Sequence, residues 1–167
     1  EQGEAFAVRC RAFLTEHAKP GRRSSIPAAK EFQGKLADAG LAGLTFPKQY
    51  GGAGLTSEHE RIWRSAAAEF PPMTSAFIIS HGMCLPMLNE FGTDDQKQRF
   101  LADNIAARTM WCQMFSEPGA GSDVASLQTK AERDGDEWIL NGQKVWTTLA
   151  HGSDYGILIA RTDPEQT

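Results

Sequence analysis

Residues 111–148 decide the fold, and they read WCQMFSEPGAGSDVASLQTKAERDGDEWILNGQKVWTT. Upstream of this stretch, apolar residues recur with the spacing of helices. From Trp111 onward the period changes to that of strands, and Gly, Asn and Asp separate the runs. The sequence therefore predicts a helical region followed by a β region, with the boundary near residues 108–110.

The β region carries two sharp turn signals, Asp134-Gly135 and Asn141-Gly142. Both central residues of a type I′ turn need positive φ, which these dipeptides tolerate. This favours a β-meander with few strands, whose exposed edge and apolar faces would make an isolated polypeptide of this length associate. The predicted strands are 111–115, 127–133, 137–140, 143–148 and 155–162.

The region before Trp111 shows helical periodicity interrupted by Gly and Pro. Ser57 with Glu60, and Thr93 with Gln96, each match a capping box that starts a helix. Helices are predicted over 4–18, ending at Lys19-Pro20-Gly21; from Pro27 to Gly40; from Ser57 to Pro71; over 74–91, broken near Gly82 and Pro86; and after Thr93. Residues 41–55, LAGLTFPKQYGGAGL, are expected to form a loop pinned to the core by Leu44, Phe46 and Leu55.

Composition is that of a globular chain of 167 residues, with 41% hydrophobic and 23% charged residues. Residues 1–110 carry 13 Lys and Arg against 12 Asp and Glu, whereas residues 111–167 carry 4 against 9. No basic stripe exists to neutralise phosphates, so nucleic acid is not expected as the main partner. Neither a membrane span nor a signal peptide is visible, and we expect a cytoplasmic protein.

The three cysteines, Cys10, Cys84 and Cys112, have no CxxC spacing. They indicate neither a disulfide framework nor a zinc site, and buried reduced thiols are expected. His81 and Cys84 are spaced to share a helical face, but no second ligand pair lies nearby in sequence, so no metal site is predicted.

Two segments of the β region suggest ligand contact. Residues 111–123 join a strand to a loop of small residues, where backbone N–H groups are accessible to a ligand. The pattern is neither a Rossmann fingerprint nor a P-loop. Residues 141–148 place Trp146 beside two hydroxyls just after a turn. Taken singly, the first pattern is more typical of a surface loop and the second of a core tryptophan.

Together, SEPGAGSD at 116–123 and NGQKVWTT at 141–148 resemble the acyl-CoA dehydrogenase family. FPKQYGGAGL at 46–55 and FGTDDQKQRFL at 91–101 add weaker features of that family. The resemblance implies an α+β chain: an N-terminal all-α helical bundle at 1–109, then at 110–167 the first part of the middle domain, an antiparallel β-barrel. The family's C-terminal helical domain is not represented, and FAD binds between the three domains.

The resemblance also implies which residues contact FAD and substrate. Ser116 is expected to hydrogen-bond the pyrimidine edge of the flavin, Trp146 to flank the ring, and Thr148 to hydrogen-bond near N5. Ser122 is expected to contact the acyl-CoA, and Gly121 to allow close backbone approach. The full set is Gln113, Phe115, Ser116, Gly121, Ser122, Trp146, Thr147 and Thr148.

The implied reaction removes a proton from Cα and a hydride from Cβ of an acyl-CoA, giving a trans-2-enoyl-CoA. The substrate would come from fatty-acid, branched or steroid side-chain catabolism. The family's proton-abstracting Glu lies on the C-terminal domain, beyond Thr167, and Glu117 is interpreted as a turn-stabilising carboxylate. An electron-transferring flavoprotein is the expected acceptor, and a homo- or hetero-oligomer, dimer or tetramer, the expected assembly.

Two features leave the activity open. Residues 113–116, Gln-Met-Phe-Ser, depart from the pattern of medium-chain enzymes and resemble a bacterial subgroup. The determinants of acyl-chain length are expected around 80–91 and beyond residue 167. The alternatives are an acyl-CoA oxidase or flavin monooxygenase on the same scaffold, and a non-catalytic subunit that completes a partner's FAD site.

Overall fold

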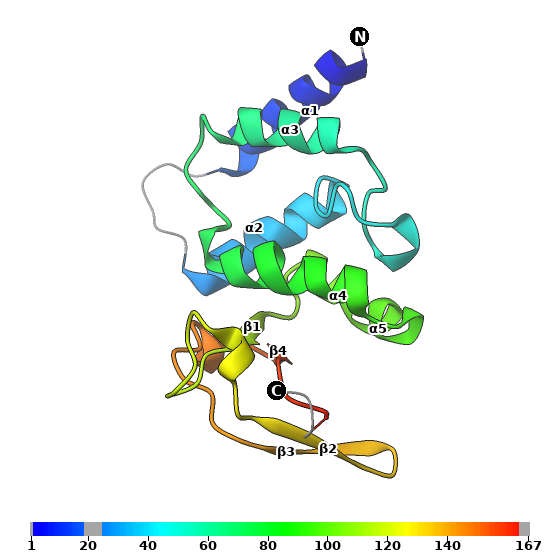
Figure 1. Ribbon diagram of the computed structural model, residues 1–167. Coiled ribbons are helices and arrows are strands. Elements are labelled where there is room, and N and C mark those ends of the chain that lie inside the picture. The colour runs from blue at the N-terminus through cyan, green and yellow to red at the C-terminus, as the bar shows by residue number, and fades with distance from the viewer. Residues whose placement is uncertain (1, 19–24, 164–167) are drawn as a thin grey trace. The chain divides into compact units, whose positions relative to one another are not determined.

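The computed structural model describes residues 2–18 and 25–163 (Figure 1). The predicted helix stop at Lys19-Pro20-Gly21 and the chain end at Thr167 lie outside the described residues. The chain divides into two compact units, Glu1–Met110 and Trp111–Thr167. The first is helical and the second carries all the described strands, so the predicted fold class is confirmed.

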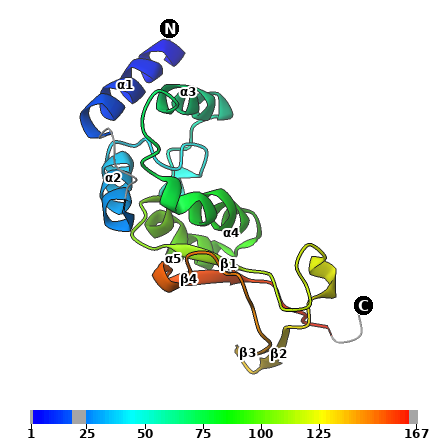
Figure 2. The same cartoon turned by 90° about the vertical axis from the view of Figure 1, so that its left-hand side faces the viewer.

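The helical unit is built from amphipathic helices that bury their apolar faces against each other. Phe6, Cys10 and Phe13 of the first helix are buried, and Phe13 packs edge-on against Phe32 with ring centroids 5.5 Å apart. Helices α4 and α5 lie side by side in both views (Figures 1 and 2). The helices are α1 (Gln2–His17), α2 (Ile26–Asp38), α3 (Ser57–Ala67), α4 (Leu85–Phe91) and α5 (Asp94–Ile105).

The segment 41–55 is a loop with one short 3₁₀ turn, Lys48–Tyr50, as predicted. It folds back on itself, because Leu55 N–H donates to Leu44 O at 2.7 Å and Gly54 N–H donates to Phe46 O at 2.9 Å. A Cβ at Gly52 would lie 2.2 Å from Phe46 O, so only glycine fits this close crossing. Of the three residues expected to pin the loop, Leu44 is buried, whereas Phe46 and Leu55 are only partly buried; Leu41 is buried as well.

One predicted capping box is confirmed and the other is wrong. Gln96 N–H donates to Thr93 Oγ1 at 3.2 Å, and Thr93 N–H donates to Gln96 Oε1 at 2.9 Å, which caps α5 as expected. At α3 the N-cap is Thr56, and Ser57 is already helical. The Thr56 hydroxyl lies 2.8 Å from His59 Nδ1, and this side-chain contact replaces a backbone cap.

The break expected within residues 74–91 is confirmed and takes the form of a π-helix at Ser80–Cys84 leading into α4. Leu85 N–H donates to Ser80 O, five residues back. The next residue, Pro86, has no N–H, so it cannot restore the regular helical bond to Gly82. A short 3₁₀ turn, Ser75–Phe77, precedes it.

Over residues 111–163, the β unit forms two two-stranded sheets rather than a meander. β1 (Trp111–Met114) pairs in parallel with β4 (Tyr155–Leu158), with Trp111 opposite Tyr155. β2 (Lys130–Asp134) pairs antiparallel with β3 (Glu137–Asn141). The meander prediction is wrong because the long connection from β1 to β4 permits parallel pairing, which a hairpin turn does not.

The strand predicted at 143–148 is also wrong, since these residues make no ladder. Asn141-Gly142 is where the chain leaves β3 rather than a turn between two strands. The β2–β3 hairpin closes through Gly135 and Asp136, and only Gly135 has positive φ, at 60°. Positive φ at the first central residue alone is the pattern of a type II′ turn, not of the predicted type I′.

Apolar side chains on β3 are exposed, as expected for the strands of this region. Trp138, Ile139 and Leu140 are each about half exposed. The three cysteines are buried and none is in a disulfide, in agreement with the expected buried, reduced thiols.

Candidate functional site

Two segments without regular secondary structure, 115–117 and 144–148, are held together in the β unit. Val145 N–H donates to Ser116 O at 2.9 Å. The Lys144 ammonium donates to Phe115 O at 3.0 Å and to Glu117 Oε1 at 2.8 Å. The two motifs that the sequence singled out are therefore neighbours in space, although residues 124–140 separate them along the chain.

Glu117 is a buried acceptor that joins a third segment to these two. Its carboxylate accepts from Gln128 N–H at 2.6 Å and from Thr129 N–H at 2.9 Å. Burial raises the pKa of Glu117, but the hydrogen bonds from Lys144, Thr129 and Gln128 outweigh it and lower the pKa to about 2. The carboxylate is thus ionised at neutral pH, which fits the structural role expected of it.

The glycine loop after Glu117 is open to its surroundings. Glu117 and Ala120 exchange two backbone hydrogen bonds, 2.8 and 3.1 Å long, which form a tight turn around Gly119. A Cβ at Gly119 or Gly121 would meet no atom within 4 Å. Neither a close contact within the described residues nor a left-handed φ therefore requires glycine at these two positions. Ser122 is exposed beside them.

Trp146 has an unusual conformation for an aromatic residue. Its side chain is 90% exposed and its φ is +57°, in the left-handed region that bulky residues rarely adopt. A left-handed φ in a residue other than glycine costs about 1 to 3 kcal/mol, so Trp146 is a strained residue. The core interpretation of this tryptophan is wrong in the described structure.

The remaining predicted residues lie on either side of the joined segments. Gln113 is part of β1, and Phe115 and Ser116 follow that strand directly. All three are partly accessible, as is Thr147, whereas Thr148 is exposed. The structure brings the neighbourhood of Ser116 against that of Trp146 through the Val145 hydrogen bond.

Sequence reasoning missed Lys144. It is the cation that fixes the site, with its side chain 8% exposed. The available signal was a lysine within a run of apolar and hydroxyl residues, together with a glutamate in the other motif. The pairing of these two residues depends on the tertiary fold and could not be read from spacing.

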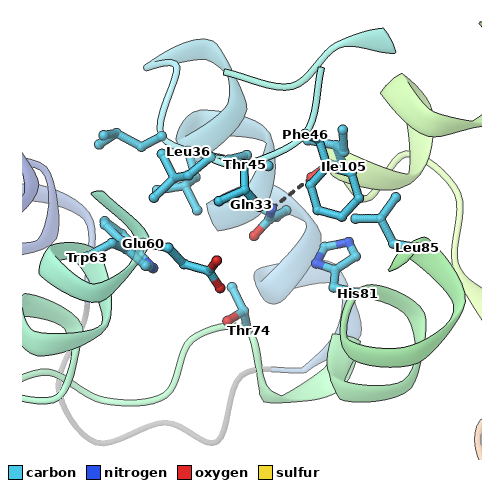
Figure 3. Close-up of a pocket in the computed structure, with 14 residues that line it drawn as sticks. Gln33, Leu36, Thr45, Phe46, Glu60, Trp63, Thr74, His81, Leu85 and Ile105 are labelled. Atoms are coloured by element: carbon cyan, nitrogen blue, oxygen red, sulfur yellow. Dashed lines mark hydrogen bonds between the residues drawn. The ribbon is translucent and has the colours of Figure 1, made fainter. Parts of the chain in front are cut away.

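The helical unit contains a separate cavity of about 220 Å³ (Figure 3). Gln33 Nε2 donates to Ile105 O at 2.8 Å, and His81 Nε2 lies 2.7 Å from Asn104 O. Burial lowers the pKa of His81, although its contact with Asn104 acts in the opposite direction. The polar lining also includes Thr45, Glu60 and Thr74. Much of the apolar lining comes from Trp63, Phe46, Leu36 and Leu85.

His81 and Leu85 line this cavity, and both belong to the segment 80–91 in which chain-length determinants were expected.

Among residues 2–18 and 25–163, no group of three or more His, Cys, Asp or Glu side chains is placed to hold a metal ion. Cys84 is itself buried. The helices within these ranges include none that is long and apolar enough to cross a membrane.

Comparison with known proteins agrees with the geometry over both units. The sequence model of the acyl-CoA dehydrogenase N-terminal domain matches residues 1–108, and that of the middle domain matches residues 112–167. The chain belongs to the acyl-CoA dehydrogenase family. It is 42% identical over 147 residues to acyl-CoA dehydrogenase IpdE1 of Mycobacterium tuberculosis, a match that covers 86% of this chain and 38% of that protein.

Solved structures of the family show the same fold. A chain of the ChsE4-ChsE5 complex from Mycobacterium tuberculosis matches with a TM-score of 0.79 at 35% identity, covering 98% of this chain and 43% of that one. Glutaryl-CoA dehydrogenase from Mycobacterium smegmatis, solved in complex with FADH2, matches with a TM-score of 0.73 at 25% identity, covering 98% and 43%. The chain thus spans about two fifths of the length of each of these three relatives.

Proposed function

We propose that this chain is part of an FAD-dependent acyl-CoA dehydrogenase that forms a trans-2-enoyl-CoA from a saturated acyl-CoA. The observation that carries the proposal is Trp146, exposed and left-handed, held beside Ser116 by the Val145 hydrogen bond. Family membership supports it, as does the FADH2 complex of the glutaryl-CoA dehydrogenase.

The residues present fit a flavin. An exposed indole offers an aromatic face, the hydroxyls of Ser116, Thr147 and Thr148 offer donors, and Gly121 leaves its backbone open. FAD, when bound, supplies the acceptor for the hydride from Cβ. The protein's part is to orient the ring and substrate and to place donors where negative charge develops. The proposed flavin contacts are Gln113, Phe115, Ser116, Gly121, Ser122, Trp146, Thr147 and Thr148.

The substrate proposal is an acyl-CoA thioester of fatty, branched or steroid side-chain origin, contacted by Ser122. It draws support from relatives named isovaleryl-CoA and isobutyryl-CoA dehydrogenase, at 34% identity each. The proton-abstracting glutamate is proposed to lie beyond Thr167, because Glu117 is buried and already bonded to Lys144 and Thr129. An electron-transferring flavoprotein as acceptor, an oligomeric assembly and a cytoplasmic location complete the proposal.

The experiment is to purify the full-length protein, record its visible spectrum, and add acyl-CoA thioesters of several lengths without oxygen. Bleaching of a bound flavin, with enoyl-CoA as product, is the expected result. Trp146→Ala is expected to lower FAD affinity, whereas Trp138→Ala removes an exposed tryptophan on β3 and serves as control. A protein that binds no flavin overturns the proposal.

Two other functions would give different outcomes of the same experiment. Rapid reoxidation of the reduced flavin by O₂, with release of hydrogen peroxide, indicates an acyl-CoA oxidase, and oxygen transfer to a substrate indicates a monooxygenase. Flavin uptake only in the presence of a second chain indicates a subunit that completes a partner's FAD site. The ChsE4-ChsE5 relative is itself a complex of two named chains.

A further inference from the structure

We propose that the buried Lys144–Glu117 pair is the positioning device of the flavin site, tying the two flavin-contacting segments into one surface. The inference rests on the function proposed above. It concerns two residues that are not themselves flavin contacts in that proposal. Their side chains are 8% and 5% exposed, so neither is accessible to a large ligand.

The first argument is that the segments involved lack any ladder. Residues 115–116 and 142–147 belong to no strand. Strands elsewhere in the unit are held by repeated backbone bonds, but segment 144–148 contacts segment 115–117 through one backbone bond, Val145 N–H to Ser116 O. The two bonds from Lys144 Nζ, to Phe115 O and Glu117 Oε1, supply the missing connections.

The second argument is that Glu117 also accepts hydrogen bonds from a third segment, at Gln128 and Thr129. Its two oxygens accept from Gln128 N–H, Thr129 N–H and Lys144 Nζ. Charge-assisted hydrogen bonds of this kind are shorter and about twice as strong as neutral ones. Gly142 lies so close to Thr129 that a Cβ there would be 2.3 Å from Thr129 Oγ1, so the segments already pack without slack.

The third argument is position along the chain. Lys144 precedes Trp146 by two residues, and Glu117 follows Ser116 directly. A shift in either charged group therefore moves a proposed flavin contact. Rotamers locked by such supporting contacts are what keep a binding site within a fraction of an ångström of its working geometry.

The test uses the full-length protein with Lys144→Met, which keeps an unbranched side chain one atom shorter and removes the ammonium, and the double variant Glu117→Gln/Lys144→Met. Lys35→Met is the matched control, because it breaks an exposed Lys35–Glu31 pair of 2.7 Å in the helical unit. Measurements are FAD affinity, the visible spectrum of the flavin at saturation, the melting temperature, and hydrogen exchange of the Val145 amide without FAD.

Lys144→Met is expected to weaken FAD binding about tenfold to a hundredfold, the range found when residues that orient metal ligands are lost. Its Val145 amide exchanges faster, and the spectrum of its bound flavin at saturation differs from wild type. Because the single variant leaves a buried carboxylate without its cation, the double variant regains melting temperature. It does not regain FAD affinity, since no side chain then bonds to Phe115 O. Lys35→Met changes none of these quantities.

Two results overturn the proposal. If FAD affinity follows melting temperature through the series, and the double variant regains both, then the pair acts only on overall stability. If Lys144→Met binds FAD with an unchanged spectrum and unchanged Val145 exchange, then the pair does not position the segments. A wild-type protein without FAD instead overturns the proposed function, and the Val145 exchange rates still decide whether the pair holds the two segments together.

Discussion

The helical unit and the β unit stabilise their chains in different ways. In the helical unit, large apolar side chains such as Phe77, Leu101 and Ile105 are almost completely buried. In the β unit, β3 exposes its apolar side chains, and the order of the irregular segments comes from a buried ion pair and its hydrogen bonds. The stabilisation from apolar packing is proportional to the buried area and does not specify single contacts, whereas a buried ion pair with its hydrogen bonds depends on particular atoms. The four predictions below test this contrast.

The largest expected effect is loss of a core leucine. Leu101→Ala in α5 removes a side chain with no exposed surface and is expected to cost about 2 to 5 kcal/mol in the free energy of unfolding. Leu140→Ala on β3, where the side chain is 54% exposed, is expected to cost under about 0.5 kcal/mol. Chemical denaturation of the full-length protein measures both, and equal losses would show that the β unit packs its core like the helical unit.

Two glycines give the next comparison. Gly52→Ala places a methyl group 2.2 Å from the Phe46 carbonyl oxygen and is expected to destabilise the protein by about 1 to 3 kcal/mol. Gly121→Ala meets no atom of the chain, so it should leave the melting temperature unchanged and lower the affinity for FAD. Calorimetry and a flavin titration distinguish the two. A destabilised Gly121→Ala variant would mean that this loop is packed rather than open.

Acid should weaken the Glu117–Lys144 pair before it affects the apolar core. The pKa of Glu117 in the folded protein is about 2, below its value of 4.5 in an unfolded chain. Its contribution to stability is therefore complete above about pH 4.5 and is lost as the pH falls towards 2. Glu117→Gln is expected to be less stable at pH 6 and to lose less additional stability between pH 5 and 3. Denaturant melts across this range in both proteins measure it, and parallel curves would contradict the assignment.

Helix caps should give the smallest effects. Thr93→Ala removes the side chain that accepts from Gln96 N–H and should cost about 1 kcal/mol. Ser57→Ala changes the other predicted capping box, Ser57 with Glu60. It should change stability by only a few tenths of a kcal/mol, because Ser57 is not the N-cap. Thermal denaturation of the two single variants makes the comparison, and a larger loss for Ser57→Ala would restore the predicted capping box.

Prediction from sequence succeeded where the signal is local. This holds for helices α1 and α2, which follow from side-chain spacing, for the cap at Thr93, and for the interruption near Pro86, which follows from one missing N–H. It failed where a choice between partners had to be made. At the start of α3 the capping-box pattern pointed to Ser57, whereas the N-cap is Thr56, whose hydroxyl contacts His59 Nδ1.

The candidate site divides in the same way. The motifs containing Ser116 and Trp146 were visible as residue patterns, and the family they resemble is confirmed. Their proximity was implied only through that resemblance. The conformation of Trp146 was not foreseen, because a strand was predicted at 143–148 where the chain instead turns through a left-handed residue.

By itself, then, the sequence determined the order of helix and strand, the loop at 41–55 and the identity of the motifs, because periodicity, glycine and proline act over short distances along the chain. Only the tertiary structure decided that β1 pairs in parallel with β4 and that Lys144 meets Glu117. These contacts join residues that lie far apart along the chain, and their stability depends on burial, which no local pattern encodes.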